Sequence, residues 1–314
     1  MEGKIFDIYR LTTHDGPGMR DTVFLKGCSL SCVWCQNPES IDFEDKVWYR
    51  KNCCIGCGMC LGVCPSGAVS SGEKGIKFDY KACLGCYACT EVCVSGALSA
   101  IAERVSTEDV LRRVMRDKAY FEVSGGGVTL SGGEPLLQPE FTQELLTKLK
   151  KQGISTALDT CAMVSENVFT TTLPLTDILL LDIKVYDGEA HRQLTGADNR
   201  QILSNAIAAA AYVKENPSHR FWVRTPIIPG ATDSDENLGA IARFIRTELA
   251  GTVERWELCM FNRAATVKYE SLGMEWRYQS MPSISAGTRD RLLGLAAENA
   301  GCEVIASGII QEEK

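Results

Sequence analysis

Short apolar runs alternate with longer amphipathic segments along most of the chain. The apolar runs are too short for ordinary helices and are rich in β-branched and aromatic residues, so they predict strands. These predicted strands are residues 22–26, 128–130, 155–158, 178–183, 221–228, 254–260 and 303–306.

The amphipathic segments between these runs predict helices at residues 106–118, 140–152, 205–215, 234–249 and 288–300. Ser106 has the character of an N-cap, with Asp109 three residues on, and Gly153 is a natural residue to end the second helix. Strand–helix alternation predicts an α/β fold of parallel βα units, closed or partly closed into a barrel, with an open doubly wound sheet as the alternative. In either fold the chemistry is expected at the C-terminal ends of the strands.

One stretch, residues 51–100, breaks this alternation because it is rich in glycine and cysteine and has no room for a βα unit. It contains an internal repeat, in which residues 54–68 (CIGCGMCLGVCPSGA) match residues 83–97 (CLGCYACTEVCVSGA) in spacing. We therefore predict a small inserted domain at 51–100, with 1–50 and 101–314 forming the main domain.

Composition limits the possible partners and suggests metal. The 314 residues are 45% hydrophobic and 23% charged, with a net charge of −7, and no basic run favours nucleic acid. No apolar stretch is long enough to cross a bilayer and no signal peptide is visible, so we expect a cytoplasmic protein with no membrane partner. Twelve of the fifteen cysteines lie between Cys28 and Cys93. In a reducing compartment this density favours metal ligation over disulfides.

The first cysteine group, Cys28, Cys32 and Cys35, directly follows the strand predicted at 22–26. Three thiolates on one loop hold three irons of a [4Fe–4S] cubane and leave the fourth iron open to the amine and carboxylate of a small molecule. A structural zinc site is the alternative, and it would need a fourth ligand such as Cys53.

The repeat contains two full runs with the spacing of bacterial ferredoxins, although Val94 replaces the proline that follows the first run. In such pairs the fourth cysteine serves the other cluster. We therefore assign one [4Fe–4S] cluster to Cys54, Cys57, Cys60 and Cys93, and the other to Cys83, Cys86, Cys89 and Cys64. Cys53 is surplus, and Cys161, Cys259 and Cys302 are expected to be core residues.

A Gly132-Gly133-Glu134 sequence follows the strand predicted at 128–130. Glycines let the backbone approach a ligand closely, and a carboxylate suits an ammonium group. Alone the sequence is weak evidence, but downstream of Cys28-x3-Cys32-x2-Cys35 it resembles the radical S-adenosylmethionine (radical SAM) superfamily, in which this motif binds the methionine amine.

Three further segments narrow the resemblance: residues 14–20 (HDGPGMR), 158–160 (LDT) and 181–184 (LDIK). With the motifs above, they resemble the glycyl radical enzyme activating enzymes, in the subgroup with an added two-cluster domain that serves dehydratases, decarboxylases and carbon–heteroatom lyases. The resemblance implies a partial (β/α) barrel of the radical SAM type with an inserted ferredoxin-like 2[4Fe–4S] domain.

The resemblance also implies roles for individual residues. Asp182 and Lys184, on either side of Ile183, would be catalytic: they bind the cofactor and line the site of the glycine. Asp159, Thr160 and Asp182 would surround a monovalent cation. The resemblance makes the following residues cofactor-binding: Trp34, Cys35, Gln36, Gly132, Gly133, Glu134, Asp159, Asp182, Ile183, Lys184, Arg224 and Asn262. Asn262 stands where pyruvate formate-lyase activase has a cofactor-contacting histidine. Structure alone offers another explanation for Asp182 and Lys184, a strand-end ion pair.

The implied reaction is the transfer of an electron through the Cys28/Cys32/Cys35 cluster to S-adenosylmethionine. The resulting 5′-deoxyadenosyl radical would take a hydrogen from a glycine in the C-terminal loop of a glycyl radical enzyme, with flavodoxin or ferredoxin as reductant. Two alternatives stay open: a radical SAM enzyme acting on a small molecule or another peptide, and an electron carrier. An amine-binding loop disfavours the carrier, and the Asp15-Gly16-Pro17-Gly18 segment and the Asp182/Lys184 pair favour the activase.

Overall fold

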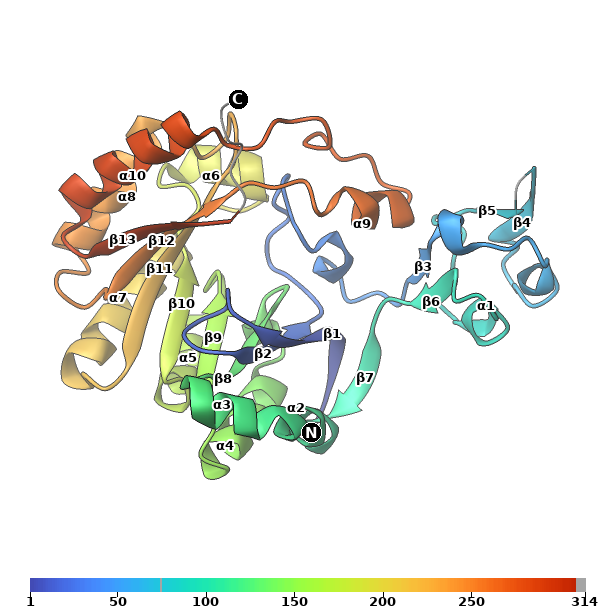
Figure 1. The fold of residues 1–314 in the computed structure, drawn as a ribbon, viewed down its shortest axis with the longest axis horizontal. Helices are drawn as coiled ribbons and strands as arrows, with labels where there is room; N and C mark the ends of the chain where they lie inside the picture. Colours follow the sequence, from blue (N-terminus) through green and yellow to red (C-terminus); the bar gives the residue numbers. More distant parts are fainter. Residues whose placement is uncertain (74, 309–314) are drawn as a thin grey trace.

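The computed structural model describes residues 1–73 and 75–308, and within them one sheet of nine strands forms the body of the molecule (Figure 1). The strand order is β13-β12-β11-β10-β9-β8-β2-β1-β7. The strands are β1 (Glu2–Thr12), β2 (Arg20–Leu25), β7 (Glu103–Ser106), β8 (Gly127–Gly132), β9 (Ser155–Thr160), β10 (Ile178–Asp182), β11 (Arg220–Ile227), β12 (Arg255–Met260) and β13 (Glu303–Ser307).

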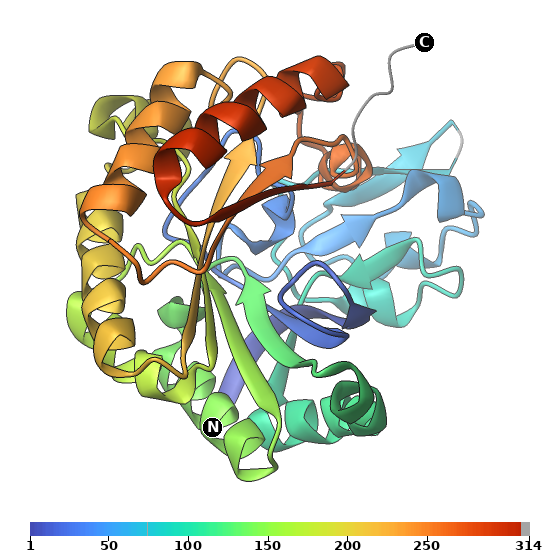
Figure 2. The ribbon, with the colours of Figure 1, turned by 60° about the vertical axis from the view of Figure 1, so that its left-hand side comes forward.

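From β2 through β13 every neighbouring pair in this sheet is parallel, whereas β1 pairs antiparallel with β2 and with β7. The sheet curves around one side of the molecule, and helices cover its outer face (Figure 2). Because β13 and β7 lie at opposite ends of the strand order, the barrel is partial within the described residues. The predicted fold class is confirmed.

The helices pack their apolar faces on the sheet. They are α2 (Thr107–Val114), α3 (Lys118–Ser124), α4 (Pro139–Lys151), α5 (Glu166–Thr172), α6 (Gly188–Thr195), α7 (Arg200–Glu215), α8 (Asp235–Thr247), α9 (Thr266–Ser271) and α10 (Ala286–Ala300). The Ser106 hydroxyl accepts from the Asp109 amide at 3.1 Å, which confirms the predicted N-cap of α2. Among the described residues no helix has both the length and the apolar content that crossing a bilayer requires.

Some elements were not predicted. Strand β1 is half exposed along its length, so its apolar positions are too scattered to stand out from the flanking polar residues. Helices α5, α6 and α9 have six to eight residues, fewer than a clear helical period needs. These short helices matter because two of them, α6 and α9, border the site described below.

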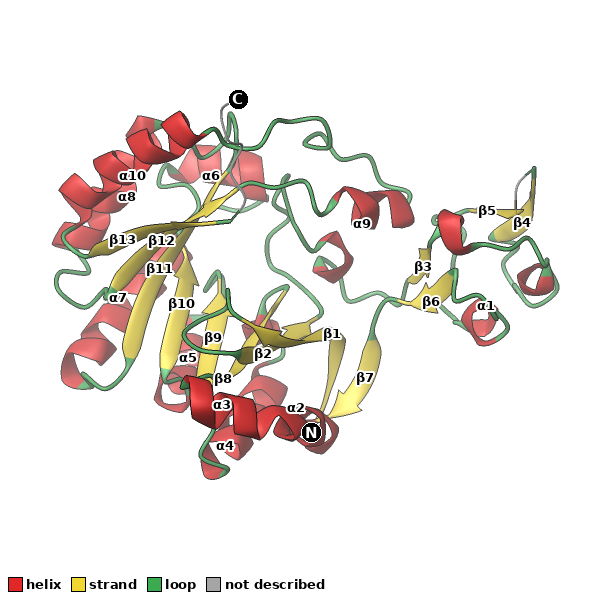
Figure 3. Cartoon of the chain, in the orientation of Figure 1, coloured by secondary structure: helices red, strands yellow, loops and turns green. Residues whose placement is uncertain are grey.

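The cysteine-rich segment lies to one side of the sheet and consists mostly of loops (Figure 3). Strand β3 (Val47–Tyr49) pairs antiparallel with β6 (Leu98–Ala100), and β4 (Val69–Gly72) with β5 (Gly75–Phe78). A short helix, α1 (Ala88–Glu91), completes it. The segment has its own hydrophobic cluster, which includes Val47, Ile76 and Leu98. The β3–β6 pair holds its two ends together, as an insertion requires, and the limits 51–100 stay a prediction.

Candidate active site and iron–sulfur sites

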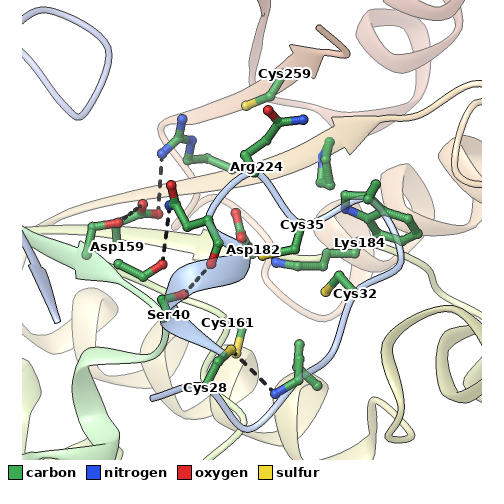
Figure 4. A pocket seen from close by; sticks show the side chains of 18 of the residues that line it. Cys28, Cys32, Cys35, Ser40, Asp159, Cys161, Asp182, Lys184, Arg224 and Cys259 are labelled. Carbon is green, nitrogen blue, oxygen red and sulfur yellow. Dashed lines mark hydrogen bonds and ion pairs between the residues drawn. The ribbon is translucent and has the colours of Figure 1, made fainter. Parts of the chain in front are cut away.

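A cavity of about 300 Å³ opens where strands β8 to β12 end and the Cys28–Cys35 loop passes over them (Figure 4). The predicted residues that line it are Cys28, Cys32, Trp34, Cys35, Gln36, Gly132, Gly133, Asp159, Thr160, Asp182, Lys184, Arg224 and Asn262. Of the residues predicted to bind the cofactor, Glu134 and Ile183 do not line it. Parallel strands end at one edge of a sheet, so side chains distant in sequence converge there.

The Cys28–Cys35 loop follows β2 and is held from outside by the C-terminus of α6. The amide of Ser31 donates to the Thr195 carbonyl at 2.7 Å, and the amide of Val33 donates to the Leu194 carbonyl at 3.0 Å. Carbonyls at a helix C-terminus lack partners within the helix, so the loop satisfies both. The loop is therefore fixed by backbone contacts, which leaves its cysteine side chains directed to the cavity.

The three thiols of the loop have different surroundings: contact with the Cys161 thiol lowers the pKa of Cys28, whereas burial acts in the opposite direction on the other two. Burial raises the pKa of Cys32 to about 12 and also raises the pKa of Cys35, so neither would be a thiolate without a nearby cation. Within the described residues no group of three or more His, Cys, Asp or Glu side chains is arranged to hold a single metal ion. Three thiols on one loop fit a [4Fe–4S] cubane, because each can hold a separate iron and the fourth iron stays open.

The Gly132-Gly133 backbone forms one wall of the cavity, at the end of β8. Gly132 has φ +120°, and a Cβ on Gly133 would lie 2.1 Å from the Gly27 carbonyl oxygen, so only glycine fits. The next side chain, Glu134, is fully buried and lies behind the cavity lining. Its carboxylate accepts from the amides of Leu136 and Cys161, at 3.0 and 2.9 Å, and from the Thr160 hydroxyl at 2.8 Å.

Asp182 and Lys184 line the cavity at the end of β10 and form an ion pair. Both side chains lie on the same side of the strand, whereas the side chain of Ile183 between them is buried outside the cavity. The backbone carbonyl of Ile183 accepts from the Thr225 hydroxyl at 2.7 Å. Burial alone would lower the pKa of Lys184, but the Asp182 carboxylate and the Cys32 thiol raise it above its ordinary value. Lys184 is therefore a fixed positive charge beside the cysteine loop.

A second set of ion pairs centres on Arg224 and reaches across β10 to β9 as well as to the neighbouring strand β12. Arg224 on β11 lies 3.3 Å from Asp159 on β9 and 3.3 Å from Glu257 on β12. Burial raises the pKa of Asp159 to about 6, although Arg224 opposes this effect. The Ser131 hydroxyl also donates to Asp159 at 2.7 Å. Asp159 is thus held by Ser131 and Arg224, and Thr160 beside it bonds to Glu134.

The far wall is formed by the residues after Cys35 and after β12. The side-chain amide of Gln36 donates to the Asn262 carbonyl at 3.2 Å. The Asn262 side chain accepts from the Ala264 amide at 2.9 Å, so it is already used in shaping its own loop. Trp34 is buried and lines the same cavity.

Several residues of the cavity were not predicted as site residues, among them Ser131, Cys161, Cys259 and Phe261. Cys161 and Cys259 were expected in the core, and both are also cavity residues. Their position at or just after a strand end is the signal that identifies them, because every neighbouring strand end contributes to the cavity. The Cys161 thiol donates to the Glu134 carboxylate at 3.1 Å, and its sulfur lies next to that of Cys28 (Figure 4).

Cysteines from both repeats meet in the cysteine-rich segment. A cavity of about 20 Å³ is lined by Cys54, Cys57, Cys60 and Cys93, three from the first repeat and one from the second. In the second group, burial raises the pKa of the Cys89 thiol to about 11. The nearby thiols of Cys83, Cys64 and Cys86 contribute to this rise, so the four cysteines lie close together. The structure thus brings together the cysteines predicted for each cluster, whereas Cys53 is exposed and its thiol donates to the side chain of Asn52.

The two repeats also fold alike. Gly58 and Tyr87, at equivalent positions, both adopt left-handed backbone conformations, with φ of 73° and 61°. Cys64 and Cys93 each contact the hydroxyl of the serine two residues on, at 3.7 Å in both cases. The sequence repeat is therefore a structural repeat, with pseudo-equivalent surroundings for the two groups of cysteines.

Comparison with known families agrees with these features. The radical SAM superfamily profile matches residues 80–240, and the 4Fe-4S dicluster domain profile matches residues 46–105. The isethionate sulfite-lyase activating enzyme of Desulfovibrio desulfuricans is 41% identical, over 87% of this chain and 88% of that protein. The choline trimethylamine-lyase activating enzyme of Oleidesulfovibrio alaskensis is 35% identical, over 92% of this chain and 93% of that protein.

A solved structure shares the fold at low identity. A radical SAM methyltransferase from Sphaerobacter thermophilus is 14% identical, covers 98% of this chain and 75% of its own, and has a TM-score of 0.54. At that identity the likeness concerns the fold alone.

Proposed function

Since the chain belongs to the glycyl radical enzyme activating enzymes of the radical SAM superfamily, we propose which of its residues carry that activity. The protein activates a glycyl radical enzyme by radical chemistry of S-adenosylmethionine, and it carries iron–sulfur clusters. The supporting observation is that the cysteine loop, the glycine wall and the Asp182/Lys184 pair border one cavity.

Cys28, Cys32 and Cys35 hold the catalytic cluster in this proposal. When bound, the cluster would supply the one electron that breaks the S–C5′ bond of S-adenosylmethionine, which would release methionine and the 5′-deoxyadenosyl radical that takes the hydrogen of the partner's glycine. The chain's own residues bind S-adenosylmethionine and orient it. The carbonyls of Gly132 and Gly133 accept from the methionine amine, and Lys184 presents a cation to the carboxylate of the same molecule.

Burial of the cavity residues supports a second role, the exclusion of water. Lys184, Thr160 and Phe261 are each less than 10% exposed, so a radical formed here meets little solvent. Asp182 orients Lys184 through their ion pair, and Arg224 holds Asp159 through another. In this proposal Asp159, Thr160 and Asp182 also bind a monovalent cation.

The two groups of cysteines in residues 51–100 hold two further [4Fe–4S] clusters in this proposal, which brings the total to three. The physiological reductant is a flavodoxin or ferredoxin. The partner is a glycyl radical enzyme of the dehydratase, decarboxylase or carbon–heteroatom lyase type, because the relatives above serve lyases. A large enzyme with a C-terminal glycyl radical motif encoded beside this gene is the expected partner.

The function is tested by anaerobic reconstitution with iron and sulfide, followed by incubation with S-adenosylmethionine, dithionite and the neighbouring glycyl radical enzyme. We expect 5′-deoxyadenosine release and the electron paramagnetic resonance doublet of a glycyl radical. The matched control, Cys32→Ala, should lose both. If 5′-deoxyadenosine forms without any radical on the partner, the alternative of a small-molecule or other peptide substrate is favoured.

A further inference from the structure

Helix α9 lies between the cysteine-rich segment and the main body of the molecule (Figure 1). It has only six residues and was not predicted from the sequence, yet it contacts both iron–sulfur regions. The contacts on its two sides are of different kinds and involve neighbouring residues.

On the side of the active site, α9 holds the residues that follow Cys35. The Tyr269 hydroxyl donates to the Cys35 carbonyl at 3.1 Å, and Tyr269 is only 5% exposed. The Lys268 ammonium lies 2.7 Å from both the Asn37 side-chain oxygen and the Glu39 carboxylate. The last residues of the cysteine loop are therefore positioned by α9, as its first residues are by α6.

Tyr269 itself is fixed by a stacked partner. The Trp276 ring lies 5.1 Å from the Tyr269 ring at an interplanar angle of 13°. A buried tyrosine in a stacked pair has little freedom to move its hydroxyl, so a shift of α9 is passed on to the Cys35 carbonyl rather than absorbed.

On the side of the cysteine-rich segment, the end of α9 rests on Tyr80. The Tyr80 hydroxyl donates to the Ser271 carbonyl at 2.7 Å. Its ring lies so close to Gly273 that a Cβ there would come within 2.4 Å of it. Leu272 also packs in a small apolar cluster with Ile101 and Trp48. Gly273 has φ +65°, so glycine is needed both for the turn and for this contact.

Tyr80 in turn belongs to the core of the cysteine-rich segment. Its ring packs on Phe78 at 4.8 Å, and Phe78 packs on Tyr49 at 6.1 Å. The Tyr49 hydroxyl and the Cys54 sulfur lie side by side near Gly75. Contacts thus run without a break from Cys54, a predicted ligand of one cluster, to Cys35, a predicted ligand of another.

We propose that Tyr80 and Tyr269 are positioning residues through which the cysteine-rich segment orders the catalytic cysteine loop. Tyr80 fixes the position of α9 on the cysteine-rich segment, and Tyr269 fixes the position of the Cys35 end of the loop on α9. A segment that is folded around its clusters then favours the loop geometry that binds S-adenosylmethionine. This inference rests on the proposed function of the loop, and it assigns to the segment a structural role that does not depend on electron transfer.

The test uses the anaerobically reconstituted full chain and removes single hydroxyl groups. In Tyr80→Phe, amide hydrogen exchange of residues 32–39 should be about three- to tenfold faster, the effect of one lost hydrogen bond, although residue 80 does not contact them. Tyr269→Phe should do the same. In the double variant the increase should not exceed the larger single effect, because both hydroxyls act along one path.

The matched control is Tyr278→Phe, because the buried Tyr278 hydroxyl has no hydrogen-bond partner among the described residues. It should leave exchange unchanged, as should peptides covering β10 in every variant. The second measurement is the change that S-adenosylmethionine causes in the electron paramagnetic resonance spectrum of the reduced catalytic cluster, which should be weakened in Tyr80→Phe and unaltered in Tyr278→Phe.

The inference is overturned if Tyr80→Phe speeds exchange only around residues 75–83 and 271–274, if the two single effects multiply, or if the spectral change is untouched. These outcomes are distinct from failure of the proposed function. That failure would remove the spectral response to S-adenosylmethionine from the unmodified protein, whereas exchange at residues 32–39 would still test the coupling.

Discussion

The Glu134 carboxylate accepts a hydrogen bond from the backbone amide of Cys161 at 2.9 Å, across the gap between the ends of β8 and β9. With the Leu136 amide and the Thr160 hydroxyl as further donors, it ties three parts of the cavity wall together. The carboxylate was expected to bind the methionine amine. These hydrogen bonds make Glu134 a brace between neighbouring strand ends, and its contact with the methionine amine stays a prediction.

Glu134→Gln should destabilise the protein by about 1–3 kcal/mol, because an amide group cannot accept from all of these donors and one of them is left unpaired in a buried site. The measurement is the anaerobic melting temperature of the reconstituted protein. Glu140→Gln, on the exposed first turn of α4, is the control and should change little. Unaltered stability combined with lost S-adenosylmethionine binding would instead assign Glu134 to the ligand.

Gly133→Ala should damage the cavity far more than its size suggests. The added methyl group would overlap the Gly27 carbonyl at 2.1 Å, and backbone cannot move aside as a flexible side chain can. We expect a loss of about 3 kcal/mol or more and no binding of S-adenosylmethionine in equilibrium dialysis. Gly294→Ala is the control: it lies within α10 with open space around it and should stabilise by about 0.5–1 kcal/mol. Binding by the Gly133→Ala variant would contradict the proposed wall.

The iron content should be about twelve per chain, four for each of three clusters. Replacing Cys57 and Cys86 together by serine should remove the two clusters of the cysteine-rich segment and leave about four irons. Cys53→Ser should keep the full content, because that thiol is exposed and apart from both cysteine groups. Iron analysis with Mössbauer spectroscopy gives the count. A plateau near four irons in the unmodified protein, with the thiols between Cys54 and Cys93 free to alkylate, would contradict the assignment.

Lys184→Met keeps the length of the side chain and removes the charge, so it separates binding from packing. It should fold, retain all its iron, and lower the yield of glycyl radical about ten- to hundredfold, the effect of a lost charge-assisted contact. The electron paramagnetic resonance doublet of the glycyl radical on the partner enzyme measures this yield. Asp182→Asn should in addition destabilise the fold, since it leaves the buried ammonium without its carboxylate. A normal radical yield from Lys184→Met would make the lysine only a structural partner of Asp182.

Titration of the buried Asp21 carboxyl group should lower the stability of the folded protein as pH rises. Burial raises its pKa to about 7 from 3.8, with Asp117 adding to the effect and Arg10 opposing it. The folded protein therefore holds a proton that the unfolded chain releases, and stability is lost between about pH 4 and pH 7. Asp21→Asn mimics the protonated acid, so it should raise the melting temperature at pH 8 by about 2–4 °C and match the unmodified protein only below about pH 4. Asp117→Asn should destabilise, because Asp117 pairs with Arg10. Equal effects of Asp21→Asn at both pH values would exclude this titration.

The sequence alone determined the fold class and the cysteine groups. Buried parallel strands are continuous apolar runs, so β10 and β11 were identified within one or two residues at each end. The spacing of cysteines is a local property, and it sufficed to group Cys93 with Cys54, Cys57 and Cys60, which border one cavity in the structure. Strand ends carrying Asp159, Asp182 and Gly132 converge for the same reason, because parallel strands end at one edge of the sheet.

Only the tertiary structure decided the direction of Glu134 and the role of α9. A motif fixes which residue is present, but two of the residues that donate to Glu134, Thr160 and Cys161, lie at the end of another strand. The six residues of α9 carry too few apolar positions to define a helix, and their contacts with Cys35 and Tyr80 bridge 234 and 191 positions of sequence. Contacts over such separations arise only when the chain has folded, since packing and not local preference selects them.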